Sequence, residues 1–276
     1  MFYVLNSSLD IWQILLLSAI SLLVGILGGF VGLALGTMRL PAILLIARDM
    51  PASIAGGTNI VVSALSALAG SYQHLKDRRV DLGVLLVMGI PSILGAFVGG
   101  FFSEVAPEAL LIALAGILVL WQGIEFLILV RVQPSTDSTR HTTPQKRLNL
   151  NAPRFSTEAG IGLSIGLLGG SVGLILGSIR LPALVRVLKM DPRIAAGTNL
   201  AIGFLVGAFG FVGHGLRGQV DLTLMASMGV AGMVGSYLGA RLTRRVGANT
   251  LIITIGWILL AVGTLLIWNA YLRWQS

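Results

Sequence analysis

The sequence predicts an all-α, polytopic membrane protein whose two homologous halves are arranged as inverted repeats. We expect about 8–10 helical segments in the membrane, some of them broken or re-entrant. Three observations predict this class: an apolar composition, a series of long runs without charged residues, and an internal repeat.

The composition excludes most soluble classes. Hydrophobic residues make up 55% of the 276 residues and charged residues only 11%, with a mean hydropathy of +0.90. A soluble domain has about 25% charged residues, so we exclude a soluble enzyme, a disordered chain and a DNA-binding domain. The net charge of +8 is instead typical of basic cytoplasmic loops. Because cysteine is absent, disulfides and thiolate sites are excluded as well.

Eight runs without charged residues are the candidate membrane segments. A spanning helix needs about 20 apolar residues, and most of the runs reach that length. The shortest continues to Val130 past a single acid, Glu125. The eight runs cover residues 11–38, 50–75, 82–103, 109–124, 159–179, 194–216, 222–240 and 246–272.

A polar stretch separates two membrane domains. Residues 133–156 are basic and rich in Ser, Thr and Pro, which is typical of a linker. We therefore expect a first membrane repeat over residues 1–132 and a second over residues 157–276.

The two domains repeat one another in sequence. Residues 25–41 and 166–182 are identical at 12 of 17 positions, GILGGFVGLALGTMRLP against GLLGGSVGLILGSIRLP. The match continues in order through Gly-Thr-Asn triplets, single histidines and Val-Asp-Leu segments, at 57–59 and 197–199, His74 and His214, and 80–82 and 220–222. Chance similarity between apolar segments does not reproduce polar residues in order, so we infer a duplication of the kind found in many transporters.

The basic residues favour an inverted arrangement of the halves. With an even number of membrane crossings in each half, 10 of the 19 Lys and Arg lie on one side of the membrane and nine on the other. Such a split does not identify the cytoplasmic side. If residues 11–48 and 159–189 form hairpins that return to their starting side, 14 lie on the linker side, three lie opposite and two lie inside the hairpins. Since basic residues collect in cytoplasmic loops, we expect a cytoplasmic linker and both termini outside. The pattern leaves open whether the hairpins span fully or re-enter halfway.

The best candidates for a functional site are the two LGxxRLP motifs at residues 35–41 and 176–182. Each has an arginine near the middle of the second hairpin arm, where burial in the membrane costs about 3 kcal/mol or more. The glycine permits a break, and the proline suits the first turn of a half-helix whose free N–H groups and arginine would bind an anion near the bilayer midplane. Alternatively, the arginines snorkel to the membrane surface. The substrate-binding residues predicted here are Gly36, Arg39, Pro41, Gly177, Arg180 and Pro182.

The Gly-Thr-Asn triplets place uncharged polar residues within two apolar runs. We include Thr58, Asn59, Thr198 and Asn199 in the predicted substrate path, because their side chains offer hydrogen bonds without charge. Two alternatives stay open: the side chains cross-link helices, or the asparagines cap a helix.

The remaining polar residues in apolar runs have simpler interpretations. Histidines without nearby acids make a poor metal site, so we interpret His74 and His214 as interfacial and expect no metal. Asp81 and Asp221 precede apolar runs, as helix N-caps do. Glu125 either carries a coupling proton or lies near the membrane surface, and the arginine that follows it favours the surface.

In these features the chain resembles the sulfite exporter TauE/SafE family of bacterial membrane permeases. The resemblance rests on the glycine-rich segments that end in Pro41 and Pro182, the triplets with their histidines, the Val-Asp-Leu segments, and the later motifs GAFVGGFF and GSYLGARL. It covers nearly the whole chain outside the linker, and it implies transport of small anions such as sulfite, sulfonates, related organosulfur anions or carboxylates. Family members typically have a run like GVGGG before the proline, whereas larger residues and an arginine stand there in both halves of this chain.

The predicted function is therefore that of a permease, which moves a small anion across the bacterial inner membrane by alternating access. A passive anion channel with the same site is one alternative, and a non-transporting membrane scaffold, which has no need of duplicated polar motifs, is another. The expected partners are the small anion and the lipid bilayer. We expect no nucleic acid, no cofactor and no enzymatic activity, and the sequence leaves open a homo-oligomer.

Overall fold

The computed structural model describes residues 9–31, 33, 35–76, 78–131, 152–242 and 248–275, and these residues form helices and no strands. The first half contains α1 (Ile11–Val31), α2 (Gly36–Ile46), α3 (Ala52–Lys76), α4 (Leu82–Phe102), the short 3-10 helix η1 (Ser103–Val105) and α5 (Glu108–Arg131). The second half contains α6 (Ala152–Val172), α7 (Gly177–Pro182), the π-helical turn η2 (Ala183–Val187), α8 (Pro192–Leu216), α9 (Leu222–Leu242) and α10 (Ala248–Gln275). Of the predicted linker, residues 133–151 lie outside the described residues, and residues 152–156 belong to the start of α6.

The described helices have the character of a membrane protein, which confirms the predicted all-α polytopic class. Seven of them are long and apolar enough to cross a membrane, namely α1, α3, α4, α5, α8, α9 and α10. Large apolar side chains such as Leu15, Leu94 and Trp257 are more than half exposed, whereas Thr58 and Thr198 are fully buried. An apolar outside around a polar interior suits a bilayer, where exposed polar groups have no water to bind.

Close packing at glycines joins the two halves. A Cβ atom on Gly25 of α1 would lie 3.1 Å from the backbone nitrogen of Ser236 in α9. The equivalent contact joins α4 to α6, where a Cβ atom on Gly95 would lie 2.7 Å from the backbone nitrogen of Leu167. Helix backbones approach this closely only where small residues line the contact. Glycines therefore allow α1 to pack closely on α9, and α4 on α6.

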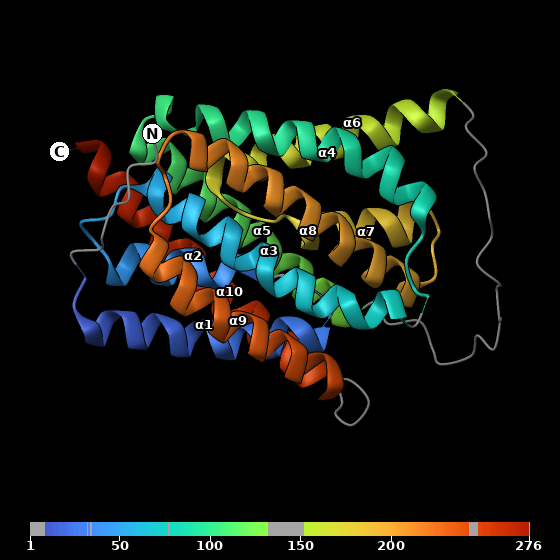
Figure 1. Ribbon diagram of the computed structural model, residues 1–276, viewed down its shortest axis with the longest axis horizontal. Coiled ribbons are helices and arrows are strands. Elements are labelled where there is room, and N and C mark those ends of the chain that lie inside the picture. Colours follow the sequence, from blue (N-terminus) through green and yellow to red (C-terminus); the bar gives the residue numbers. More distant parts are fainter. Residues whose placement is uncertain are drawn as a thin grey trace.

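Helices α3 and α8 cross side by side at the centre of the molecule (Figure 1). A Cβ atom on Gly70 would lie 3.6 Å from the Leu200 side chain, and one on Gly210 would lie 2.6 Å from the Ile60 side chain. The contact positions therefore rise along one helix as they fall along the other, and the pair is antiparallel. These two helices, which are equivalent in the sequence repeat, therefore run in opposite directions.

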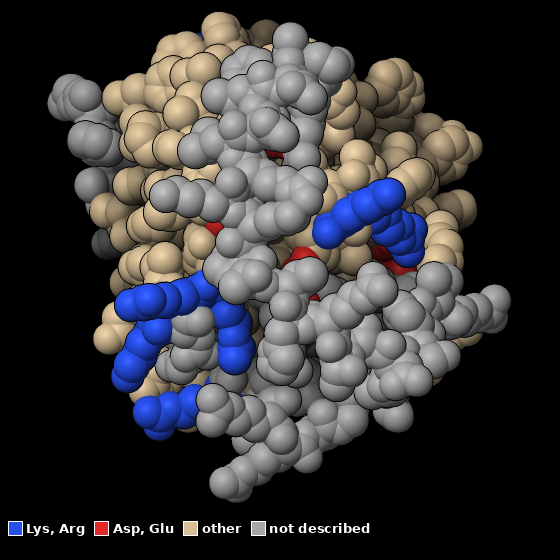
Figure 2. Space-filling view, turned by 90° about the vertical axis from the view of Figure 1, so that its right-hand side faces the viewer, with Lys and Arg blue, Asp and Glu red and all other residues tan. Residues whose placement is uncertain are grey.

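Basic side chains gather at one end of the molecule. Helix α1 begins and α10 ends at the left of Figure 1, whereas α5 ends and α6 begins at the opposite, linker end. Figure 2 looks onto the linker end and shows Lys and Arg side chains spread over it. The basic residues in the described loops and helix ends there include Lys76, Arg78, Arg79, Arg186, Lys189 and Arg241, whereas those at the other end are Arg48, Arg217 and Arg273.

Both α1 and α6 end at a glycine-rich break. The Leu33 N–H donates to the Gly28 carbonyl at 2.9 Å, and the Leu174 N–H donates to the Gly169 carbonyl at 2.7 Å. Such bonds close the ends of helices. In the second half Gly173 has φ +76°, a left-handed conformation that glycine adopts without steric cost.

After each break the chain turns back as a half-length helix. The Gln13 side chain at the start of α1 donates to the Ile46 carbonyl at the end of α2, at 3.0 Å, so α2 returns to the side from which α1 came. Its 11 residues span about 16 Å, against about 30 Å for the hydrocarbon core. The second arm of the hairpin therefore crosses about half of the membrane.

Three details predicted for these hairpins are wrong. Gly36 and Gly177 are the first helical residues and do not form the break, which lies just before them. The arginines stand in the first turn of the returning arm rather than near its middle. Pro41 and Pro182 are the sixth helical residues and lie past the first turn. The reason is that the first N–H groups of a helix need no partner inside it, so the helix starts at once at the glycine. The proline then removes one later bond, and after Pro182 the helix widens into η2.

Candidate functional site

Arg39 lies in the first turn of α2, and its side chain is 1% exposed. Its Nη1 donates to Ser63 Oγ at 3.3 Å, and its Nη2 donates to Ser66 Oγ at 2.9 Å. Ser66 in turn donates its own proton to the Val62 carbonyl at 2.9 Å, which leaves its oxygen lone pairs for the guanidinium. Only Nε of Arg39 lacks a hydrogen-bond partner among the described residues. Two serine hydroxyls of α3 therefore solvate this charge.

Arg180 lies in the same position of α7 and is 0% exposed. Its Nε donates to Asn199 Oδ1 on α8 at 2.9 Å. Its Nη1 and Nη2 have no hydrogen-bond partner in the part of the chain that the structure describes. A Cβ atom on Gly203 would lie 3.8 Å from Nη2. The residue of α8 next to this end of the guanidinium is therefore a glycine, which has no side chain.

The burial of both arginines excludes the snorkelling alternative, because neither guanidinium reaches the surface. Ser63 and Gly203 are each the twelfth residue of a 25-residue helix, so both arginines lie near mid-depth. Neither forms an ion pair with an Asp or Glu within the described ranges. A buried charge without a partner costs several kcal/mol, and such a cost is typical of residues retained for function.

The threonines of the triplets cross-link the two halves. Asp221 at the start of α9 donates its backbone N–H to Thr58 Oγ1 at 2.9 Å. In the equivalent bond, Asp81 at the start of α4 donates its backbone N–H to Thr198 Oγ1, also at 2.9 Å. The cross-linking alternative therefore accounts for both threonines.

The asparagines lie two turns inside α3 and α8, so the capping alternative is wrong. Asn59 Nδ2 donates to the Gly173 carbonyl at 2.9 Å, which holds the break of the second half against α3. A Cβ atom on Gly36 would lie 3.1 Å from Asn59 Nδ2, and one on Gly177 would lie 2.9 Å from Asn199 Nδ2. Each asparagine is therefore packed against the start of its own returning helix, which requires glycine there.

His214 is buried, and its interpretation as an interfacial residue is wrong. Its Nδ1 lies 2.8 Å from Gln219 Oε1, and its Nε2 lies 2.9 Å from the Gly170 carbonyl. Ser103 Oγ donates to the same Gln219 oxygen at 2.7 Å. The partners come from α6, η1 and the loop after α8, which the apolar run around the histidine does not reveal. His74 is half-buried.

The acidic residues follow their predicted roles. Asp81 Oδ1 accepts from two N–H groups at the start of α4, at 2.9 and 3.1 Å, and Asp221 Oδ1 accepts from the Leu224 N–H at 2.9 Å. Both N-cap predictions are thereby confirmed. Burial raises the pKa of Asp221. Glu125 lies 3.4 Å from Nη2 of Arg186, whose side chain is half exposed near the linker end, which favours the surface interpretation of Glu125.

Sequence reasoning missed the serines that bind Arg39. Ser63 and Ser66 follow the triplet on α3, and the repeat alignment shows that α8 has no hydroxyl at the equivalent positions. That difference is visible in the sequence. Its meaning is not, because the sequence does not state which face of α3 contacts α2.

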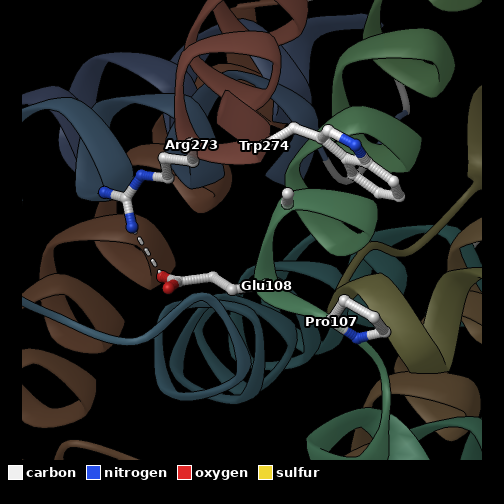
Figure 3. Close-up of a pocket in the computed structure, with 5 residues that line it drawn as sticks. Pro107, Glu108, Arg273 and Trp274 are labelled. Carbon is white, nitrogen blue, oxygen red and sulfur yellow. Dashed lines mark hydrogen bonds and ion pairs between the residues drawn. The ribbon is translucent and has the colours of Figure 1, made fainter. Parts of the chain in front are cut away.

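A surface hollow lies at the end where α10 stops, lined by Pro107, Glu108, Ala109, Arg273 and Trp274 (Figure 3). Nη1 of Arg273 lies 2.8 Å from Glu108 Oε1. The two charges neutralise one another and are partly exposed, so the hollow offers no net charge to a small ion.

Comparison with known proteins gives a consistent picture. The family model described as "Sulfite exporter TauE/SafE" matches residues 17–266. "Probable membrane transporter protein YunE" of Bacillus subtilis (strain 168) is 23% identical over 265 residues, which cover 92% of this chain and 97% of that protein. "Probable membrane transporter protein YdhB" of the same organism is 26% identical over 232 residues, with coverage of 83% and 90%. A "Probable membrane transporter protein" of Xylella fastidiosa (strain Temecula1) is 25% identical over 256 residues, with coverage of 88% and 94%. No solved structure matches the chain.

Proposed function

Because the chain belongs to the sulfite exporter TauE/SafE family of membrane transporters, we propose that it moves a small oxoanion across the cytoplasmic membrane through a site at its buried arginines. The anion is sulfite, a sulfonate, or a related organosulfur or carboxylate anion. One observation carries the proposal: Arg39 and Arg180 are fully buried, and no described carboxylate pairs with either of them.

The polar atoms without partners near the two arginines support an anion rather than a cation. Most of these atoms carry hydrogens that can be donated, and the only pure acceptor among them is Asn59 Oδ1. A cation needs acceptors, whereas an anion needs donors and positive charge. Hydrogen bonds to a charged group are worth about 1.5–3 kcal/mol each, so several such donors would stabilise an anion at this site. The atoms are Arg39 Nε, Thr37 Oγ1, Asn59 Oδ1, Arg180 Nη1, Arg180 Nη2 and Asn199 Nδ2.

Alternating access between inverted halves is the mechanism that we propose. The antiparallel crossing of α3 and α8, equivalent in sequence, supports the inverted relation. In such transporters the broken helices meet near the midplane, and one half rocks against the other to open the site to each side in turn. The basic residues at the linker end support a cytoplasmic linker and termini outside.

The first experiment measures anion uptake into proteoliposomes. A thermal-shift screen of the purified chain against sulfite, thiosulfate, sulfoacetate and acetate selects the anion, because a ligand that binds the folded state stabilises it. We expect the double variant Arg39→Gln/Arg180→Gln to insert and fold but to lose uptake. The matched control is Arg48→Gln/Arg241→Gln, which removes the same charge from exposed positions and is expected to keep uptake.

Two results would contradict parts of the proposal. If Arg39→Gln/Arg180→Gln takes up the anion at the wild-type rate, the anion site does not lie at these arginines. Preloading the vesicles with unlabelled anion tests the mechanism, because a carrier exchanges anions faster than it moves them one way, whereas a channel does not. Uptake that preloading leaves unchanged would replace alternating access by a passive channel.

A further inference from the structure

The two arginine centres differ in the residues that the neighbouring long helix places beside them. On α3, the Oγ atoms of Ser63 and Ser66 accept hydrogen bonds from the Arg39 guanidinium, at 3.3 and 2.9 Å. At the equivalent positions of α8, counted from the Gly-Thr-Asn triplet, stand Gly203 and Val206. Both are buried, and neither has a polar side-chain atom. The second half therefore has the same charge but lacks the groups that solvate it in the first.

The unpartnered atoms of the two centres differ in kind as well. Around Arg39 they comprise one N–H of the guanidinium, the acceptor Asn59 Oδ1 and the Thr37 hydroxyl, which both donates and accepts. Around Arg180 they are Nη1, Nη2 and Asn199 Nδ2, all of which are donors. Buried donors without acceptors are costly. The second centre therefore has three buried donors for which the described residues supply no acceptor.

We propose that the chain binds one oxoanion at a time, in direct contact with Arg180 and Asn199 in the second half, and that Arg39 supports the site from the first half by fixing α2 to α3. This proposal rests on the proposed function and names which half of the molecule performs the binding. It also makes Gly203 the residue that keeps the guanidinium of Arg180 open to the anion.

The donors at Arg180 match the geometry of an oxoanion. The planar guanidinium fork presents Nη1 and Nη2 side by side, and such a fork binds two oxygens on one central atom. Asn199 accepts from Arg180 Nε through Oδ1, which fixes the amide and leaves Nδ2 as a third donor. In the proposed site an anion with three oxygens on one atom uses all three donors, a carboxylate uses two, and chloride offers the fork a single acceptor atom.

The test transfers the environment of Arg39 to Arg180. A Cβ atom on Gly203 would lie 3.1 Å from the Ile175 side chain and 3.8 Å from Arg180 Nη2, so Gly203→Ser fits after a small shift and places a hydroxyl beside the fork. Gly160→Ser is the matched control, because a Cβ atom there meets nothing within 4 Å. The measurement is isothermal titration calorimetry of the purified full chain with sulfite, with acetate and chloride as comparison anions.

We expect one sulfite per chain, bound more tightly than acetate. Loss of the bonds at the fork should weaken sulfite binding about 100-fold in Arg180→Gln and about 10-fold in Gly203→Ser. Arg39→Gln should weaken sulfite binding far less than Arg180→Gln does, and Arg39→Lys, which keeps the charge, serves if the glutamine variant does not fold. Gly160→Ser should bind as the wild type does.

Three results would overturn the proposal, and they are distinguishable. Equal losses of affinity in Arg39→Gln and Arg180→Gln, or two sulfites per chain, would replace the single site by two and leave the proposed function intact. If Gly203→Ser binds sulfite with wild-type affinity, Gly203 does not keep the guanidinium of Arg180 open to the anion. Unchanged affinity in both arginine variants, or no binding of sulfite or acetate to the wild-type chain, would overturn the proposed function together with this inference.

Discussion

The surroundings of Arg39 and Arg180 differ far more than the motifs that contain them. Both arginines stand four residues into a short helix after a glycine break, and both are buried. Arg39 meets two serine hydroxyls, whereas Arg180 meets one asparagine and a glycine. The duplication supplies the charge twice, and different residues on the facing helix surround each charge.

The comparison shows that two arginines in repeated motifs can have different surroundings. The backbone N–H groups of Asp221 and Asp81 donate to Thr58 and Thr198 at the same distance, so these contacts between the halves are symmetric. The divergence concerns the serine positions of α3, which are Gly203 and Val206 in α8. One half can then stabilise the fold while the other binds the anion.

The largest expected effect comes from making the first centre resemble the second. Ser63→Gly/Ser66→Val removes both hydroxyls from Arg39 and leaves a buried charge without partners, which costs about 3–5 kcal/mol in the free energy of unfolding. We expect sulfite to restore part of this loss, because Arg39 then offers the same open fork as Arg180. The measurement is equilibrium unfolding in mixed micelles, with and without sulfite.

The control for this variant is Ser164→Gly, which changes an exposed serine of α6. It should cost no more than about 1 kcal/mol, the helix propensity of glycine, and sulfite should not restore that loss. An unchanged free energy of unfolding in Ser63→Gly/Ser66→Val would show that the serine bonds do not stabilise Arg39.

A smaller effect separates the two asparagines. Asn199→Ala removes one donor to the anion and the group that orients Arg180, so we expect sulfite affinity to fall about 10-fold. Asn59→Ala removes the donor to the Gly173 carbonyl, so we expect a loss of about 1 kcal/mol in stability with sulfite affinity retained. Titration calorimetry and unfolding of both variants measure the two quantities, and equal losses of affinity would contradict the assignment of the site to one half.

Much of the fold could be predicted because it depends on local composition. Runs without charged residues gave the long helices. The hairpin over residues 11–48 followed from the distribution of basic residues. The exact start of α2 at Gly36 did not follow, because the proline in the motif falsely suggested a first turn.

The candidate site could be predicted only in part, because its bonds join distant segments. The arginines were recognisable as charges in apolar surroundings. The partner of Thr58 lies 163 positions away, and that of His214 on α6 lies 44 positions away, which no local pattern reports. The serines beside Arg39 were equally hidden, since an isolated serine in an apolar helix gives no sign of its partner.

The smallest expected difference concerns the threonines, and it tests whether the asymmetry is confined to the arginine centres. Thr58→Val and Thr198→Val each keep the shape of the side chain and leave one backbone N–H, of Asp221 or Asp81, without its acceptor. Each variant should lose about 1–3 kcal/mol in the free energy of unfolding, and the two losses should be nearly equal because the bonds are equivalent. Sulfite affinity should be retained in both, because neither threonine contacts an arginine by a described hydrogen bond. Clearly unequal losses of stability in mixed-micelle unfolding would mean that the contacts between the halves have diverged as well. The difference between Arg39 and Arg180 would then not be attributable to the residues that face them alone.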